Sequence, residues 1–529
     1  MQLKILKTLI LICYFCIAIK QQVFAIDISY SLLRQSNTTS TKEWLNLLHY
    51  HKGESVINPD STFFLAKDGH KNPEAEFAAT IQAISDKDNK IYCEYPARTN
   101  FIISSMKLNP KDFDFSQCPK YQEFLQKVPM DTVAIVFAAE NNQSPSSILG
   151  HSFLKISGQS KTGLKEHSFS YFAAFDTANS IKFYIDVMTS GIDGAYILSP
   201  YRSKADEYVF NEKRSLWEFE LDLSEQDKQR LKDHLWELKG KNIHYKFVTH
   251  NCNTALISIL KVANPSFETQ TIKPFITPVE YVQDLYKQKK IKDISIEPTV
   301  YVKNKINQYG VKNILSSNKS SRIDISYVNS SEYDNILFQL SPVYQDIKDI
   351  NSAYYDDIES KIGEVTLGYN IQKKKVAIQN INILKMQSIL DYSIQNDFSK
   401  YFRLALENSW NDVSTHLKPT VEFGLGYGKS YHNVTAYFLP KIGYRYNQYG
   451  NFYLTPEIGL NTQITENIKL MTSYAEYFDS KDDNRGYGAR YSFYVGYKFT
   501  DNKNIYLNYK HYTQTDNQNS IIFGFSQNF

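Results

Sequence analysis

Residues 486–499 read GYGARYSFYVGYKF. Every second residue of this stretch is apolar or aromatic: Tyr487, Ala489, Tyr491, Phe493, Val495, Tyr497 and Phe499. The same period of two runs through residues 432–446 and 451–463. A sustained period of two is typical of β-strands that turn one face to an apolar environment and the other to a polar one.

About twelve such segments follow one another in the last third of the chain. They lie near residues 321–328, 334–341, 360–370, 374–388, 400–409, 415–427, 432–446, 451–463, 466–478, 486–499, 504–513 and 518–529. An even number of strands returns both ends of a barrel to the same side of a membrane. We therefore predict an all-β outer-membrane barrel of about 12 antiparallel strands. A soluble sandwich or barrel is the alternative, which the unbroken succession of ten-residue strands disfavours.

The composition agrees with a membrane barrel. The chain contains 40 Tyr and 32 Phe but only 4 Trp, and tyrosine suits the aromatic girdles at membrane interfaces. A mean hydropathy of −0.42, without an apolar run of membrane length, excludes spanning helices. The chain ends on Phe529, in phase with Phe523 and Phe525, which resembles the terminal strand of bacterial outer-membrane barrels.

The first 25 residues have the three-part layout of a secretory signal peptide. Lys4 and Lys7 precede the apolar residues 8–19, and Val23-Phe24-Ala25 reads as a small-residue cleavage site. An N-terminal anchor helix is the alternative, but this apolar stretch is too short to span a bilayer.

The whole chain is long enough for several domains. Its 529 residues allow two to four domains, and 59 basic against 56 acidic residues exclude a nucleic-acid-binding protein on charge. We expect a soluble domain over residues 26–290, a polar linker over 291–320 and the barrel over 321–529. Residues 26–130 show mostly helical spacing, and residues 131–139 form an apolar run typical of a buried strand.

Cys252 is the candidate nucleophile of the soluble domain. It follows Asn251 and precedes an apolar helical pattern, so we expect it at a helix N-terminus. The helix dipole and exposed N–H groups at such a position favour the thiolate and lower the pKa of the thiol. A nearby imidazole would complete the environment that a cysteine nucleophile needs.

His151 is the candidate base. It stands where Gly150 leads into an alternating strand, and residues 167–172 read as the neighbouring antiparallel strand. Papain-like hydrolases pair a strand histidine with a helix-terminal cysteine, but here the histidine comes first, as in circularly permuted NlpC-like folds. His167 is the candidate for the residue that orients His151. Other candidates for this role are Ser168, Ser170 and Asp176.

An ordered set of short motifs extends this pattern. The set is residues 93–98 (CEYPAR), 150–154 (GHSFL), 191–196 (GIDGAY), 200–201 (PY), 207–208 (EY), 214–217 (RSLW), 235–238 (LWEL) and 251–252 (NC). Together they resemble the Lnb-type N-terminal periplasmic domain, a Cys/His thiol-enzyme family named for a bacterial lipoprotein N-acyltransferase. The resemblance implies an α+β papain-like fold, with Cys252 as nucleophile and His151 as base. That family's acyltransferases carry helical membrane segments, whereas this chain carries a predicted barrel.

The other two cysteines of the mature chain are Cys93 and Cys118. They are disulfide candidates, and three buried thiols without a role are the alternative. We expect no metal and no cofactor, because the chain after the predicted signal peptide has no Cys-x-x-Cys or His-Glu-x-x-His spacing.

These features predict a membrane-associated cysteine acyltransferase that acts through a Cys252 thioester. Its expected partners are the outer membrane and a phospholipid or lipoprotein substrate. One alternative is a hydrolase of peptidoglycan amides or lipid esters with the same dyad. Another is a non-catalytic outer-membrane barrel or channel.

Overall fold

The computed structural model describes residues 38–529 with internal gaps. The gaps are residues 60–61, 87–88, 140–149, 174–181, 183–185, 188, 248, 272, 274, 311–312, 331–333, 351–356, 409–416, 447–450, 480–487 and 514–517. The predicted signal peptide and Asp176 therefore lie outside the described residues.

The chain divides into two compact units, each built from several stretches of sequence. Unit 1 comprises the residues up to Ala134, Phe153–Tyr201 and Leu221–Glu268. Unit 2 comprises Ile135–Ser152, Arg202–Glu220 and Thr269–Phe529. We describe each unit by itself.

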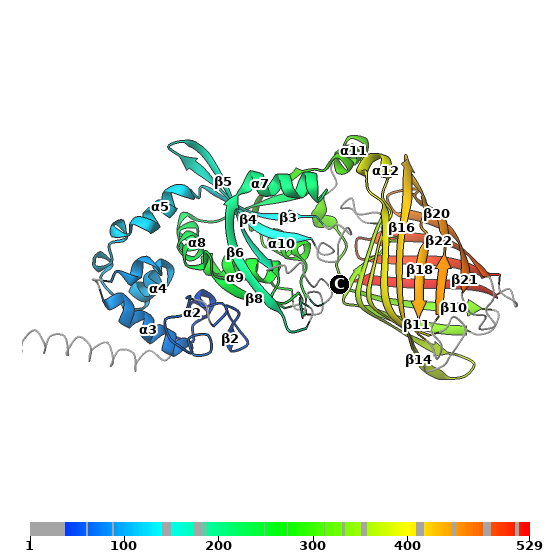
Figure 1. Cartoon of the computed structure of the whole chain (residues 1–529), viewed down its shortest axis with the longest axis horizontal. Coiled ribbons are helices and arrows are strands. Elements are labelled where there is room, and N and C mark those ends of the chain that lie inside the picture. Colours follow the sequence, from blue (N-terminus) through cyan, green and yellow to red (C-terminus); the bar gives the residue numbers. More distant parts are fainter. Residues whose placement is uncertain are drawn as a thin grey trace, which may run out of the picture. The chain divides into compact units, whose positions relative to one another are not determined.

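A seven-stranded sheet runs in the order β8-β6-β5-β4-β3-β7-β9 (Figure 1). Its strands are β3 (Thr132–Ala138), β4 (His151–Ser160), β5 (Gly163–Ala173), β6 (Ile192–Pro200), β7 (Leu216–Leu221), β8 (Asn242–Tyr245) and β9 (Ile291–Glu297). The segment 291–320, for which we expected a polar linker, thus begins with a strand and continues into α11 (Val300–Tyr309).

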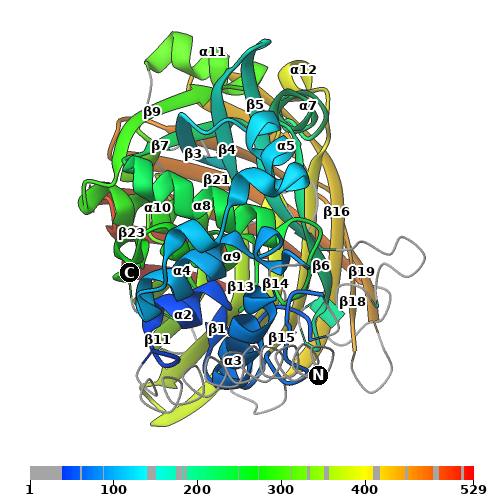
Figure 2. The ribbon, with the colours of Figure 1, turned by 90° about the vertical axis from the view of Figure 1, so that its left-hand side faces the viewer.

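The helices of unit 1 form where the sequence predicted helical spacing. They are α2 (Lys42–Leu47), α3 (Pro73–Ser85), α4 (Pro96–Met106), α5 (Pro119–Lys127), α8 (Glu225–Leu238) and α9 (Cys252–Ala263). Helix α9 packs against α8 and against β5 (Figure 2). Ser224 and Asp227 cap α8 reciprocally, as their spacing predicts. No helix in the described part of the chain is both long and apolar enough to cross a bilayer.

A buried arginine ties three parts of unit 1 together. Arg98 on α4 donates Nη1 to Glu76 Oε1 at 2.7 Å and Nε to Glu237 Oε2 at 3.0 Å, and all three side chains are fully buried. The Arg98 guanidinium also lies 4.1 Å from the ring centroid of Phe63. Two carboxylates and one guanidinium therefore hold α3, α4 and α8 together, and Arg98 has a structural rather than a substrate-facing position.

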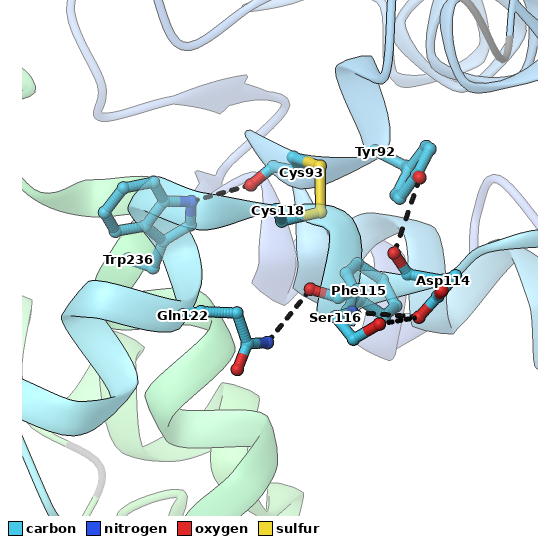
Figure 3. Close-up of a disulfide and its surroundings, with 8 residues drawn as sticks. All are labelled: Tyr92, Cys93, Asp114, Phe115, Ser116, Cys118, Gln122 and Trp236. Carbon is cyan, nitrogen blue, oxygen red and sulfur yellow. Dashed lines mark hydrogen bonds between the residues drawn. A yellow bond between two sulfur atoms is a disulfide. The ribbon is translucent and has the colours of Figure 1, made fainter.

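Cys93 and Cys118 form a disulfide with their Cα atoms 5.4 Å apart (Figure 3). Trp236 on α8 donates its Nε1 proton to the carbonyl of Cys93 at 2.9 Å. The disulfide therefore closes the loop between α3 and α5 and lies against α8.

The C-terminal part of unit 2 is a closed antiparallel barrel of twelve strands, as predicted (Figure 1). The strand segments are β10 (Arg322–Ser330), β11 (Asp334–Ser341), β12 (Val343–Gln345), β13 (Ile358–Asn370), β14 (Lys375–Ser388), β15 (Ser399–Glu407), β16 (Lys418–Tyr431), β17 (Val434–Phe438), β18 (Lys441–Arg445), β19 (Asn451–Thr455), β20 (Glu457–Gln463), β21 (Ile468–Asp479), β22 (Gly488–Thr500), β23 (Lys503–Tyr512) and β24 (Gln518–Asn528).

Three of the twelve strands are interrupted by proline, which has no N–H to donate to a ladder. Pro342 separates β11 from β12, Pro440 separates β17 from β18, and Pro456 separates β19 from β20. The barrel closes because β10 pairs with β24.

The two faces of the barrel differ as the period of two predicts. On β24, Ile521, Phe523 and Phe525 are exposed on the outside, whereas Ser526 is buried inside. Charged pairs fill the interior: Arg403 with Glu422, Lys441 with Glu457, and Lys361 with Glu359 are examples.

Residues 346–350, called the closing segment here, follow β12 and cross the barrel interior at the end where β10 begins and β24 ends. We call this end, where the polypeptide chain enters the barrel, the entry end. Arg322 on β10 binds Asp349 of this segment through Nη1 at 2.7 Å and 2.9 Å. Lys469 on β21 donates to the Asp349 carbonyl at 3.1 Å. Ile347 packs in a buried cluster with Ile389, Tyr401, Tyr437 and Leu439. The segment thus contacts strands on different sides of the barrel and closes the lumen at this end.

Candidate functional site

Cys252 is the first residue of α9, as predicted, and its half-buried thiol takes no part in the disulfide. Asn251 caps the helix: its Oδ1 accepts the N–H groups of Asn253 at 3.0 Å and Thr254 at 3.1 Å. The Nδ2 of Asn251 donates to the carbonyl of Phe247 at 2.8 Å, which fixes the loop before the helix. These bonds hold the N-terminal end of α9 in place, so its partial positive charge lies next to the thiol.

Two tyrosines lie close enough to Cys252 for its charge to act on them. Burial chiefly raises the pKa of Tyr171 and of Tyr245, and the negative charge of a Cys252 thiolate adds to both shifts. The two rings are 5.4 Å apart. Both phenols therefore stay protonated at neutral pH and can act near the thiol only as neutral hydrogen-bonding groups.

His151 begins β4, directly after Gly150, as the sequence predicts. Gly150 has φ +75°, and a Cβ at this position would lie 2.2 Å from a ring atom of Phe137. Only glycine therefore allows the chain to turn so closely before His151. The imidazole of His151 lies over the ring of Tyr208, with centroids 6.1 Å apart.

Burial lowers the pKa of His151 to about 3, and the positive charges of Arg214 and Lys204 lower it further in the same direction. Arg214 is itself held in place by hydrogen bonds of 2.8 Å to the carbonyls of Ala138 and Ala139. His151 is therefore neutral at physiological pH, which is the state in which an imidazole can accept a proton.

His167 lies in the middle of β5, where it pairs with Ile156 on β4 and Pro200 on β6. Burial lowers its pKa, and Lys165 adds to this effect. Its Nδ1 makes no hydrogen bond within the described residues. Ser168 instead hydrogen bonds to Ser199 at 2.8 Å, while the buried Ser170 hydroxyl has no such partner among the described residues.

The sequence did not single out Tyr171 or Tyr245, and it included Tyr208 only as part of the motif at residues 207–208, without a role. A usable signal exists for Tyr171, because it shares one face of β5 with Phe169. Tyr208 and Tyr245 stand beside functional candidates only through tertiary packing. In the described part of the chain, His, Cys, Asp and Glu side chains form no group that could hold a metal ion.

Three family models match the chain. Residues 120–288, which include both His151 and Cys252, match the Lnb N-terminal periplasmic domain. Residues 36–105 and 315–526 match two domains of unknown function, DUF7843 and DUF7840. No curated protein matches this chain.

Similar solved structures are outer-membrane barrels. The NanC porin is 11% identical, with coverage of 39% of this chain and 100% of its own and a TM-score of 0.28. A KdgM porin in complex with disordered oligogalacturonate is 11% identical, with coverage of 39% and 99% and a TM-score of 0.26. Omp33 of Acinetobacter baumannii is 8% identical, with coverage of 40% and 100% and a TM-score of 0.23. Closure of the present barrel follows from its own strand pairing.

Proposed function

Because residues 120–288 match the Lnb N-terminal periplasmic domain and an outer-membrane barrel follows, with the N-terminal domain in the periplasm, we propose that this chain is a membrane-associated cysteine acyltransferase. The observation that carries the proposal is Cys252 at the capped N-terminus of α9, inside the matched segment. The proposed domain fold is papain-like and circularly permuted, with the histidine strand before the cysteine helix.

In the proposed reaction, His151 accepts the proton of Cys252, and the thiolate attacks the carbonyl of an acyl ester, most simply that of a phospholipid. The C–S bond forms, the ester C–O bond breaks, and the departing alkoxide takes the proton from His151. An amine then attacks the thioester, releases the amide and returns the proton to Cys252. Water as the acceptor would make the same chain a hydrolase.

Two features support the proposed electrostatics. His151 is unprotonated before the transfer, and because its pKa is low, the imidazolium that forms needs the charge of the Cys252 thiolate to stabilise it. In the proposal, the backbone N–H of Cys252 holds the developing oxyanion, while Asn251 occupies the N–H groups of Asn253 and Thr254. In the proposal, the barrel tethers the domain to a membrane, and the phospholipids of that membrane are the acyl donors.

His167 stays our candidate for the residue that orients His151, with Ser170 as the competing candidate. His167 pairs with Ile156 of β4, and Ser170 lies three residues beyond it on the other face of β5.

Intact-protein mass spectrometry tests the proposal. Full-length mature protein and its Cys252→Ala variant are each incubated with phosphatidylethanolamine vesicles and quenched with acid. The mass of each intact protein is then measured. We expect a fatty-acyl mass increase in the wild type only, removed by neutral hydroxylamine. Cys93 and Cys118 serve as internal controls, because their disulfide leaves no thiol to acylate. The absence of an adduct in the wild type would contradict lipid acyl transfer.

Two further measurements refine the mechanism. Adding a lipopeptide with a free N-terminal amine separates transfer from hydrolysis, since only transfer yields an acylated peptide. Ser170→Ala and His167→Ala are compared for the rate of thioester formation. The residue that orients His151 is the one whose loss lowers this rate without changing the unfolding midpoint.

A further inference from the structure

The barrel encloses a polar cavity of about 540 Å³. Asp346, Ile347 and Lys348 of the closing segment line it at the entry end. Ser330 at the end of β10 and Asn519 near the start of β24 line it as well. Both lie at the end of the barrel remote from the entry end. The cavity therefore runs from the closing segment toward the far rim of the barrel. Because the entry end is periplasmic, the far rim faces the cell exterior.

The charges that line this cavity do not balance. Eight of its side chains are cationic: Lys348, Lys361, Lys385, Arg403, Lys441, Arg445, Arg490 and Lys510. Six are carboxylates: Asp346, Glu359, Glu364, Glu407, Glu422 and Glu457. Several carboxylates are shared between two cations. Glu359, for example, binds both Lys361 at 3.0 Å and Lys385 at 2.7 Å. The lining residues that the structure describes thus carry two more positive than negative charges.

The excess charge gathers around Lys510. Lys510 lies on β23 between Ser492 and Ser520 of the neighbouring strands, and no carboxylate among the described residues pairs with it. Instead, the positive charges of Lys348, Arg490 and Lys385 act on it. The Nζ of Lys348 lies 5.3 Å from the ring centroid of Tyr494 and forms no ion pair within 4 Å in the described part of the chain, although its charge also acts on Asp346.

Such crowding of cations inside a barrel is unfavourable without a counter-charge, because the screening by water is weaker there than at a surface. Amide groups of Asn380, Asn382 and Asn408 and several tyrosines complete the lining. Tyr401 and Tyr437 already donate to Glu422 and Glu457, but each amide has two N–H donors and can donate one to an oxygen-rich solute. The closing segment prevents such a solute from passing straight through toward the periplasm.

We propose that the barrel lumen is a binding site for a small oxyanion, such as a phosphate- or carboxylate-bearing solute of up to sugar-phosphate size, which enters from the cell exterior. Lys510, Lys348, Arg490 and Lys385 form its cationic wall. The site is independent of the Cys252 chemistry.

Isothermal titration calorimetry of the full-length protein in detergent micelles tests the site, with inorganic phosphate as the probe at constant ionic strength. A second titration uses glucuronate, which distinguishes carboxylate from phosphate ligands. A third uses glucose as the neutral control. We expect saturable binding of at least one anion and none of glucose. Lys510→Gln and Lys510→Glu should weaken binding, the latter by about tenfold or more, because the charge reversal introduces repulsion at contact distance.

Lys375→Glu is the matched control, since Lys375 is an exposed lysine at the start of β14 and does not line the cavity. It should bind the anion as the wild type does, and so should Cys252→Ala. Retention of the compact, heat-modifiable band on gel electrophoresis verifies that each barrel is folded. Absence of saturable anion binding in the wild type, or equal affinity in Lys510→Glu, would overturn the proposal.

Discussion

The Nε2 atoms of His49 and His234 lie 2.8 Å apart in the core of unit 1. Both residues are buried, and their rings are stacked with centroids 5.0 Å apart. One imidazole must donate and the other must accept, so the accepting ring must be neutral at Nε2, and the contact is lost when both rings are protonated. Burial lowers the pKa of His49 to about 3 and that of His234 well below its usual range.

Acid should therefore destabilise unit 1. The unfolded chain protonates these histidines below about pH 6.5, whereas folded His49 resists protonation down to about pH 3. The free energy of unfolding of unit 1 is thus unaffected by these histidines above pH 6.5 and decreases as the pH falls below it. At pH 5 the loss is about 2 kcal/mol for His49, and His234 adds to it in the same direction. Urea unfolding followed by tryptophan fluorescence measures it, since three of the four tryptophans lie outside the barrel. The double variant His49→Asn/His234→Gln should show a smaller fall between pH 7 and 5.

Arg98→Met should destabilise unit 1 by about 3–5 kcal/mol, because it leaves Glu76 and Glu237 buried without their cation. Urea unfolding at pH 7 measures the loss. The triple variant Glu76→Gln/Arg98→Met/Glu237→Gln removes all three charges and should recover part of the stability. A triple variant less stable than the single one would contradict the assignment of an ion-pair role.

The double variant Cys93→Ser/Cys118→Ser should lower the free energy of unfolding by about 3 kcal/mol, since the disulfide closes a loop with a sequence separation of 25. Cys252→Ser should leave the unfolding free energy nearly unchanged. The fraction of folded molecules that form a thioester should be the same in the disulfide variant and the wild type. A loss of thioester in folded protein would give the disulfide a role in the site.

Thioester formation should show no acid limb near pH 6.5. The pKa of His151 is lowered to about 3 by burial and by Arg214 and Lys204, so the imidazole stays deprotonated as the pH falls. Rapid-quench rates between pH 5.5 and 8 measure this, with folding checked at each pH. Lys204→Gln removes one of the cations and should raise the pKa of His151. A half-maximal rate near pH 6.5 in the wild type would contradict the pKa assignment.

The barrel should conduct few ions, because the closing segment fills its entry end. Planar-bilayer recordings are expected to show a small conductance for the wild type. The variant Ile347→Ser/Asp349→Ala loosens the buried cluster and the contact with Arg322, and should raise the conductance severalfold. Lys375→Glu is again the control. A porin-sized conductance in the wild type would show that the segment does not block the lumen.

The barrel was predictable because its strands alternate apolar and polar side chains. Most outward positions on β24 and β22 are apolar or aromatic, and most inward positions other than Ile522 and Tyr494 are small or polar, so a period of two marks the strands directly. The cap of α9 was equally visible, because Asn251 and Cys252 precede an apolar helical pattern. Local chemistry decides both features.

Long-range contacts were not predictable in this way. His49 and His234 are separated by 185 residues, and nothing in either segment indicates the other. The closing segment contains Asp346, Lys348 and Asp349, and therefore reads as a solvated loop. It is buried only because Arg322 and Lys361 inside the barrel supply partners. Strand β9 was missed because Ile291, Ile294 and Ile296 do not alternate regularly.

The pairing of β10 with β24 brings the two termini of the barrel sequence together. The N–H of Phe529 donates to the carbonyl of Ser321 at 2.9 Å, so the last residue lies beside the first turn into the barrel. A fluorescent protein or affinity tag fused after Phe529 would thus be delivered into the periplasm and could not be displayed to antibodies outside intact cells. For surface labelling or cargo display, the insertion must be made in a hairpin at the opposite rim, such as the turn between β13 and β14.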